Sequence, residues 1–160
     1  AIYGSPGWAE WAQFAPFYKG FKSDPSDLDE IYQTTRINLH NGCLAMHYRV
    51  VDALAAGGFM MVNRTRFDSL AGGILTQLMP YEHYIPFDIA EMAVPAKAWL
   101  NAGDERVRIA GLGREAVLGA HTWRHRAAQI LEDCNLPRRI SQAAAAKHGS
   151  QHLQRELDLF

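Results

Sequence analysis

The residues whose types and spacing best fit chemistry lie between positions 37 and 59. Arg49 and Asp52 stand three positions apart in a segment with helical periodicity, so both side chains project from similar sides of a helix. A guanidinium there can bind a diphosphate, and the neighbouring carboxylate can bind a ribose hydroxyl. The alternative is that Arg49 and Asp52 only form an ion pair on a solvated helix face.

A short polar loop, His40-Asn41-Gly42, comes before this helix, at the end of a predicted strand. A helix amino terminus offers free N–H groups and a positive partial charge, which suit a phosphate. We therefore predict that the terminus at residues 43–46 and Arg49 neutralise a diphosphate. His40 and Arg49 are the predicted catalytic residues, and Asn41, Gly42 and Asp52 are predicted to bind the substrate. For His40, an ordinary loop histidine is an equal alternative.

Other polar residues fit a site less closely. Glu82 and His83 stand beside a predicted strand and can bind the sugar or the base, or can be plain surface residues. Asp27 and Asp29 match a D-x-D metal pattern, but acids in a first helical turn already interact favourably with the helix dipole. No His, Asp or Glu cluster has the spacing of a zinc site. The sequence therefore predicts neither a metal nor a cofactor.

The helix that carries Arg49 follows from hydrophobic periodicity. Val50, Ala53 and Leu54 fall on one face of a helix predicted at residues 46–56. Gly57 stands where glycine commonly ends a helix. The apolar run that follows, residues 59–62, is typical of a strand buried in a parallel sheet.

The order of predicted elements indicates an α/β fold with a parallel sheet of about four strands. Strands are predicted at residues 1–3, 36–39, 59–62 and 84–87, and helices at 26–35, 46–56, 89–101, 104–119 and 122–134. Ser26 is the predicted cap of the first helix, and Pro86 indicates that the last strand lies at an edge.

Ligands of such sheets bind at the carboxyl ends of the strands. The three ends visible in the sequence are Gly4-Ser5, residues 40–42 and Asn63-Arg64. We therefore expect a pocket lined by these three loops, and Gly4 joins Glu82 and His83 among the further substrate-binding candidates.

Composition excludes several classes of protein. The chain has 160 residues and a net charge of -1, which gives no sign of a nucleic-acid partner. Its longest apolar stretch, residues 50–62, is shorter than the roughly 20 residues of a membrane span, and no signal peptide opens the chain. Two distant cysteines, Cys43 and Cys134, suggest reduced thiols in a cytoplasmic protein. The opening without methionine suggests a piece of a longer chain.

Several segments together resemble one enzyme family. The stretch YRVVDALAAGGFMMV resembles a signature R-x-(F/V)-(E/D)-A-x-A-x-G, and ERVRIAGLGREAVLGAHTWRHRAAQIL resembles an ending with His-Thr-(Trp/Tyr) and a following arginine. IYGSPGW, DLDEIYQTTRINLHN and MPYEHYIPFD also fit. Over residues 1–133 the chain is similar to spore-maturation-protein-like glycosyltransferases of the group-1 superfamily.

The resemblance implies a GT-B glycosyltransferase, in which two Rossmann-like domains face a cleft. Residues 1–135 would be the three-layer, C-terminal nucleotide-sugar-binding domain, without its first strand and helix, and residues 136–160 a helical tail. The partners would be a UDP- or GDP-sugar and an N-terminal acceptor domain absent from this chain. A hexosyltransferase activity, weak or missing in the fragment, is expected.

One position departs from the family pattern. Group-1 retaining enzymes often carry two acids spaced as Glu-x7-Glu, and Asp52 stands at the second position, where it would bind ribose. Eight residues earlier the chain has Leu44. The alternative function is therefore a non-catalytic nucleotide-binding or protein-interaction module derived from such an enzyme.

Overall fold

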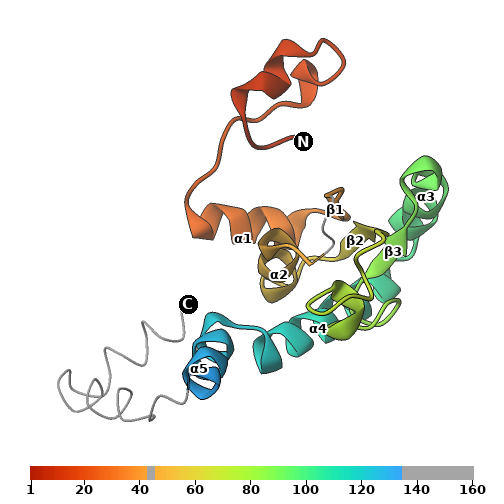
Figure 1. The fold of residues 1–160 in the computed structure, drawn as a ribbon. Helices are drawn as coiled ribbons and strands as arrows, with labels where there is room; N and C mark the ends of the chain where they lie inside the picture. The colour runs from red at the N-terminus through yellow and green to blue at the C-terminus, as the bar shows by residue number, and fades with distance from the viewer. Residues whose placement is uncertain (43–45, 135–160) are drawn as a thin grey trace.

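The structure is a computed structural model that describes residues 1–42 and 46–134. The helical tail predicted at residues 136–160 lies outside the described residues, as does Leu44. The larger elements, shown in Figure 1, are α1 (Pro25–Thr34), β1 (Asn38–His40), α2 (Tyr48–Ala55), β2 (Met60–Asn63), β3 (Ile85–Phe87), α3 (Ala93–Asn101), α4 (Gly103–Ala120) and α5 (Trp123–Asp133). Four short 3-10 helices join them: η1 (Pro6–Glu10), η2 (Ala15–Phe17), η3 (Ile74–Thr76) and η4 (Ile89–Glu91).

The sheet is parallel, with strand order β1-β2-β3. Asn38 is paired with Met60 and Met61 with Ile85, so the three carboxyl ends point to the same edge. Pro86 lies in β3 at the side of the sheet, where its missing N–H costs no ladder hydrogen bond. The predicted α/β class with a parallel sheet is confirmed.

Two apolar clusters make the core, one on each face of β2. Met60 and Val62 pack with Val50, Ala53 and Leu54 of α2, while Met61 faces the opposite way. This second face packs against residues of β3, α3 and the first half of α4, with Ile85, Phe87, Ile109 and Trp99 among them. Helices therefore cover both faces of the sheet, which makes the domain Rossmann-like with three layers.

The connection from α2 to β2 depends on two glycines. Gly57 has φ 87° and its N–H donates to the carbonyl of Leu54, in the predicted helix-ending conformation. Gly58 is packed so closely that a Cβ would lie 2.7 Å from Nδ2 of Asn38 and 2.8 Å from the carbonyl oxygen of Tyr32. This close packing sets α2 against the end of α1 and the start of β1.

The joint between α4 and α5 is fixed by His121. One ring nitrogen, Nε2, lies 3.2 Å from the carbonyl oxygen of Gln77, and the other, Nδ1, lies 3.0 Å from Nη2 of Arg126. The same Nη2 also donates to the side-chain oxygen of Gln77. Thr122 begins α5 with a capping box, in which Nδ1 of His125 accepts from the Thr122 N–H at 3.3 Å.

The prediction of a first sheet strand at residues 1–3 was wrong. Ile2 forms only an isolated bridge with Tyr18, and its N–H donates to the carbonyl of Phe17 at 2.8 Å. Residues 1–21 thus pair with one another, and Figure 1 shows this segment in red, apart from the sheet. Consequently the described sheet has three strands, and Gly4-Ser5 is not the end of one.

Two predicted helix starts were also displaced. Asp24, rather than Ser26, caps α1 by accepting a hydrogen bond of 2.8 Å from the Ser26 N–H. The helix predicted from residue 46 begins at Tyr48, because His47 has extended backbone angles and acts as the cap. Among the helices that the structure describes, none is long and apolar enough to cross a membrane.

Candidate functional site

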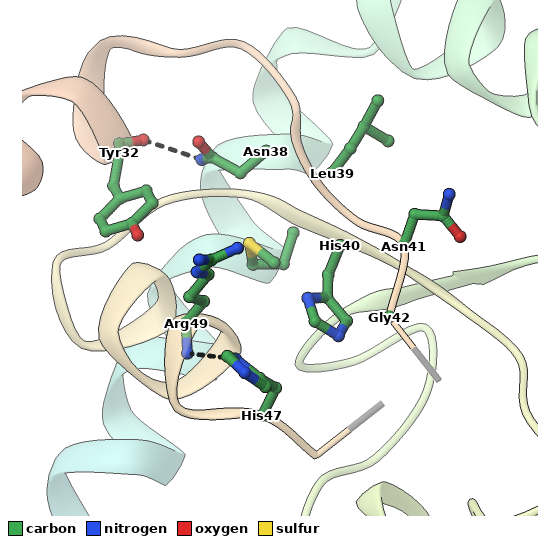
Figure 2. A pocket seen from close by; sticks show the side chains of 9 residues that line it. Tyr32, Asn38, Leu39, His40, Asn41, Gly42, His47 and Arg49 are labelled. Carbon is green, nitrogen blue, oxygen red and sulfur yellow. Dashed lines mark hydrogen bonds between the residues drawn. The ribbon is translucent and has the colours of Figure 1, made fainter. Parts of the chain in front are cut away.

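A pocket of about 360 Å³ opens where β1 ends and α2 begins (Figure 2). α1 contributes Tyr32 to its lining, and β2 contributes Met60, the first residue of that strand. The other lining residues come from β1, from the loop after it and from the first turn of α2: Asn38, Leu39, His40, Asn41, Gly42, His47 and Arg49. The pocket therefore includes four of the predicted site residues, His40, Asn41, Gly42 and Arg49.

Arg49 is the charged group of this pocket. Figure 2 shows its side chain rising from α2 between Tyr32 and His40. Within residues 1–42 and 46–134, no ion pair joins Arg49 to a carboxylate, so the alternative of an Arg49–Asp52 pair is not formed. The guanidinium carbon of Arg49 lies over the ring of Tyr48, 5.8 Å from its centroid. The guanidinium is therefore available to an anion.

Asp52 does not line the pocket. Partial burial raises the pKa of its carboxyl, and the negative charge of Asp29 on α1 raises it further. The nearby imidazole of His47 has the opposite, smaller effect. Asp52 thus lies outside the cavity that Arg49 lines, and ribose binding by Asp52 stays a prediction.

Two histidines face each other across the floor of the pocket. His40 is buried, with 7% of its surface exposed, and its ring is stacked on that of His47 with centroids 5.3 Å apart. His47 also contacts Tyr48, with ring centroids 4.1 Å apart. Burial lowers the pKa of His47, and the charges of His40 and Arg49 lower it further. A neutral imidazole is therefore favoured at position 47.

The loop after β1 is held in place by Asn63 at the end of β2. Its Oδ1 accepts from the N–H of Gly42 and its Nδ2 donates to the carbonyl of Gly42, both at 3.1 Å. Arg64 turns elsewhere, since its guanidinium pairs with Asp88 and donates to the hydroxyl of Tyr81. Of the two residues at this predicted strand end, the side-chain amide of Asn63 supports the pocket loop, whereas Arg64 does not contact it.

The structure does not bring Gly4, Glu82 or His83 to this pocket. Gly4 belongs to the amino-terminal segment, where its N–H donates to the carbonyl of Gly20 at 3.1 Å. Glu82 and His83 precede β3, so they lie at the amino end of that strand, and neither lines the pocket. Nδ1 of His83 accepts from the Met79 N–H at 3.1 Å, which ties it to its own turn.

Besides the apolar Leu39 and Met60, the predicted site residues did not include three polar residues that line the pocket. These three residues are Tyr32, Asn38 and His47. Asn38 is buried and its Nδ2 donates to the carbonyl of Tyr32 at 2.9 Å. Residues 36–40 alternate between polar and apolar, and Asn38 stands at a polar position, so the pattern predicts exposure for a side chain that is in fact buried.

Neither the D-x-D pattern nor any other acidic group forms a metal cluster among the described residues. Asp27 instead pairs with Lys22 at 2.9 Å. No group of three or more His, Cys, Asp or Glu side chains in the described part of the chain could hold a metal ion.

A second cavity, of about 410 Å³, lies between the end of α1 and the start of α4. Its wall includes two arginines, Arg36 and Arg106. The guanidinium of Arg106 already donates to the carbonyl of Trp99. This cavity is at the amino end of β2, away from the strand ends that the pocket follows.

Since a Rossmann-like fold alone does not specify a function, the family of the chain is needed. Residues 1–132 match the family described as glycosyl transferase-like. The chain belongs to this family. The match includes both the Arg49 segment and the His121 joint, so this glycosyl transferase-like chain has a glycosyltransferase-type function, for which the family implies a nucleotide-sugar donor. Neither a curated protein nor a solved structure matches the chain.

Proposed function

We propose that the pocket at the end of β1 binds the diphosphate of a nucleotide sugar, and that the chain is the donor-binding domain of a GT-B hexosyltransferase. The observation that carries this proposal is the guanidinium of Arg49, which lines a cavity without a carboxylate partner among the described residues. A guanidinium suits a diphosphate because its planar group can donate two parallel N–H···O hydrogen bonds to two phosphate oxygens.

The chemistry proposed is stabilisation of the leaving group. When the sugar–phosphate bond breaks, negative charge grows on the departing nucleoside diphosphate, and a fixed cation lowers the energy of that state. Arg49 supplies the cation, while His40 and Asn41 orient the phosphate or the sugar. Gly42, whose N–H and carbonyl are bound by Asn63, shapes the loop beside them. Because Arg49 supplies this charge, the proposal requires no metal ion and no cofactor.

The amino terminus of α2 contributes less to binding the diphosphate than the sequence predicted. The N–H of Arg49 already donates to His47, and the N–H of Val50 donates to the carbonyl of His47 at 2.9 Å. With these donors occupied, charge neutralisation rests chiefly on the Arg49 side chain.

Finer features belong to the same proposal. We infer a place in the spore-maturation-protein-like branch, a cytoplasmic location, and an N-terminal acceptor domain that faces the pocket in the complete enzyme. UDP- and GDP-sugars are the expected donors, and a glycan, lipid or protein the acceptor. These inferences rest on the motif resemblance at residues 48–62 and 105–131.

Calorimetric titration with UDP and GDP tests the proposal. Replacing Arg49 with Ala should weaken diphosphate binding by about 2 kcal/mol or more, because a charge-assisted contact is lost. Arg124→Ala is the matched control, since Arg124 is an exposed arginine of α5 outside the pocket. Equal affinities for wild type and Arg49→Ala would remove Arg49 from the site.

One observation favours the non-catalytic alternative. No Asp or Glu of the described residues lines the pocket, and the chain has Leu44 where related retaining enzymes often carry an acid. A module that binds but does not transfer would bind UDP or GDP without releasing sugar from the nucleotide sugar. Measuring nucleotide-sugar hydrolysis and transfer alongside binding separates the two functions.

A further inference from the structure

The cap of α2 is an unusual one. Helices prefer Ser, Thr, Asp or Asn at this position, because a short oxygen-bearing side chain can accept from the second or third N–H. Here Nδ1 of His47 accepts from the N–H of Arg49 at 3.2 Å. The residue that is capped is thus the same residue whose guanidinium enters the pocket.

The ring of His47 has a second set of contacts. It is stacked on the ring of His40, at the end of β1, and lies tilted against that of Tyr48, in the first turn of α2. Ser or Asn in its place could accept the hydrogen bond but could not make these ring contacts. His47 therefore joins the end of a sheet strand to the first turn of the helix that follows it.

We propose that His47 is a positioning residue of this pocket: its neutral imidazole caps α2 and holds Arg49 at the end of β1. His47 acts through the backbone of Arg49 and not on the reacting atoms. This inference rests on the proposed function for its purpose, but its geometry is independent of any ligand.

The hydrogen bond also fixes the tautomer. Because Nδ1 accepts, the proton of the neutral ring is on Nε2, and a second proton on Nδ1 would remove the cap. The charged or titratable groups around the ring are those of His40 on β1, Tyr32 on α1, and Tyr48, Arg49 and Asp52 on α2. The pKa of His47 lies below its ordinary value, so the cap persists at neutral pH and is lost as the pH falls through that lowered value.

Three substitutions separate the possible roles of the ring. His47→Asn keeps a cap and loses the stacking, His47→Phe keeps the stacking and loses the cap, and His47→Ala loses both. Without any ligand, hydrogen exchange of the Arg49 N–H at pH 7 should be slow in wild type and His47→Asn. In the Ala and Phe variants it should be about fivefold faster or more, as expected for loss of a helix cap.

The second readout is UDP or GDP affinity, recorded with the unfolding temperature of each variant. The Ala and Phe variants should bind about fivefold more weakly, and Asn should remain within about twofold of wild type. If Asn binds as weakly as Ala although its Arg49 N–H still exchanges slowly, capping does not set the affinity and the positioning role is wrong. Unchanged exchange and affinity in His47→Ala would also overturn it. If wild type binds neither nucleotide, the proposed function fails while the exchange measurement still decides the role of His47.

Discussion

At the scale of single residues, the pocket depends on small groups placed very closely. Asn38 sits beneath it, donating to the carbonyls of Tyr32 and Phe59 at 2.9 and 3.3 Å. Gly58 leaves the room for this amide. The contacts of Asn38 with Phe59 and Gly58 join residues 20 or more positions apart, so local sequence patterns do not reveal them. Arg49 was identified because its helix has clear periodicity, whereas Asn38 was hidden inside a short strand.

Gly58→Ala should be strongly destabilising. The added Cβ would lie 2.7 Å from Nδ2 of Asn38 and 3.0 Å from the carbonyl oxygen of Ala53, contacts that require backbone to move. We expect a loss of about 1–3 kcal/mol in the free energy of unfolding, the usual cost of overpacking. Chemical denaturation monitored by circular dichroism gives this quantity.

Gly111→Ala is the control for that substitution. Gly111 lies inside α4, and a Cβ there meets no atom within 4 Å. Alanine should therefore stabilise the helix by up to about 1 kcal/mol. If both variants lose the same free energy, crowding at Gly58 is not the cause.

At the scale of elements, the sequence predicted which helices and strands exist more reliably than where they begin. Residues 46–56 were predicted as a helix from Val50, Ala53 and Leu54, and those side chains are indeed buried. Its true start two residues later depends on an imidazole acting as a cap, which propensity does not anticipate. Residues 1–3 were misjudged because Ile2 pairs locally with residues 17–19, and not with β1.

The joint between α4 and α5 should be sensitive to acid. Burial lowers the pKa of His121; the hydrogen bond to Gln77 opposes this, and the charges of Arg126, His125 and His83 lower it further. Since Nδ1 accepts from Arg126, a second proton there would place two donors face to face. With a folded pKa below the ordinary value of about 6.5, neutral His121 stabilises the joint at pH 7 and above, and this contribution is lost as the pH falls through the lowered pKa.

Hydrogen exchange of α5 between pH 7.5 and 5 measures this loss. His121→Gln keeps an acceptor for Arg126 and a donor for the Gln77 carbonyl but cannot be protonated in this range. The variant should therefore keep α5 protected at pH 5, where wild type loses protection. The same pH dependence in both proteins would show that His121 is not the responsible group.

At the scale of the whole molecule, the parallel sheet decides which predicted site residues meet. All strand ends share an edge, and the pocket lies where β1 leads into α2. His40, Asn41, Gly42 and Arg49 could be predicted because strand, loop and helix are consecutive in the sequence. Glu82 and His83 precede β3, so the predicted parallel sheet already places them at its amino end and makes them poor candidates for a site at the carboxyl ends.

The most direct measurement compares UDP with uridine by NMR chemical shifts of backbone amides. If a diphosphate binds beside Arg49, UDP should shift the amides of His40, Gly42 and Arg49, and uridine should leave them nearly unchanged. The cavity lined by Arg36 and Arg106 is the internal comparison. If UDP shifts mainly the amides around Arg36 and Arg106, or if uridine shifts the amides of the pocket as much as UDP does, a diphosphate does not bind beside Arg49.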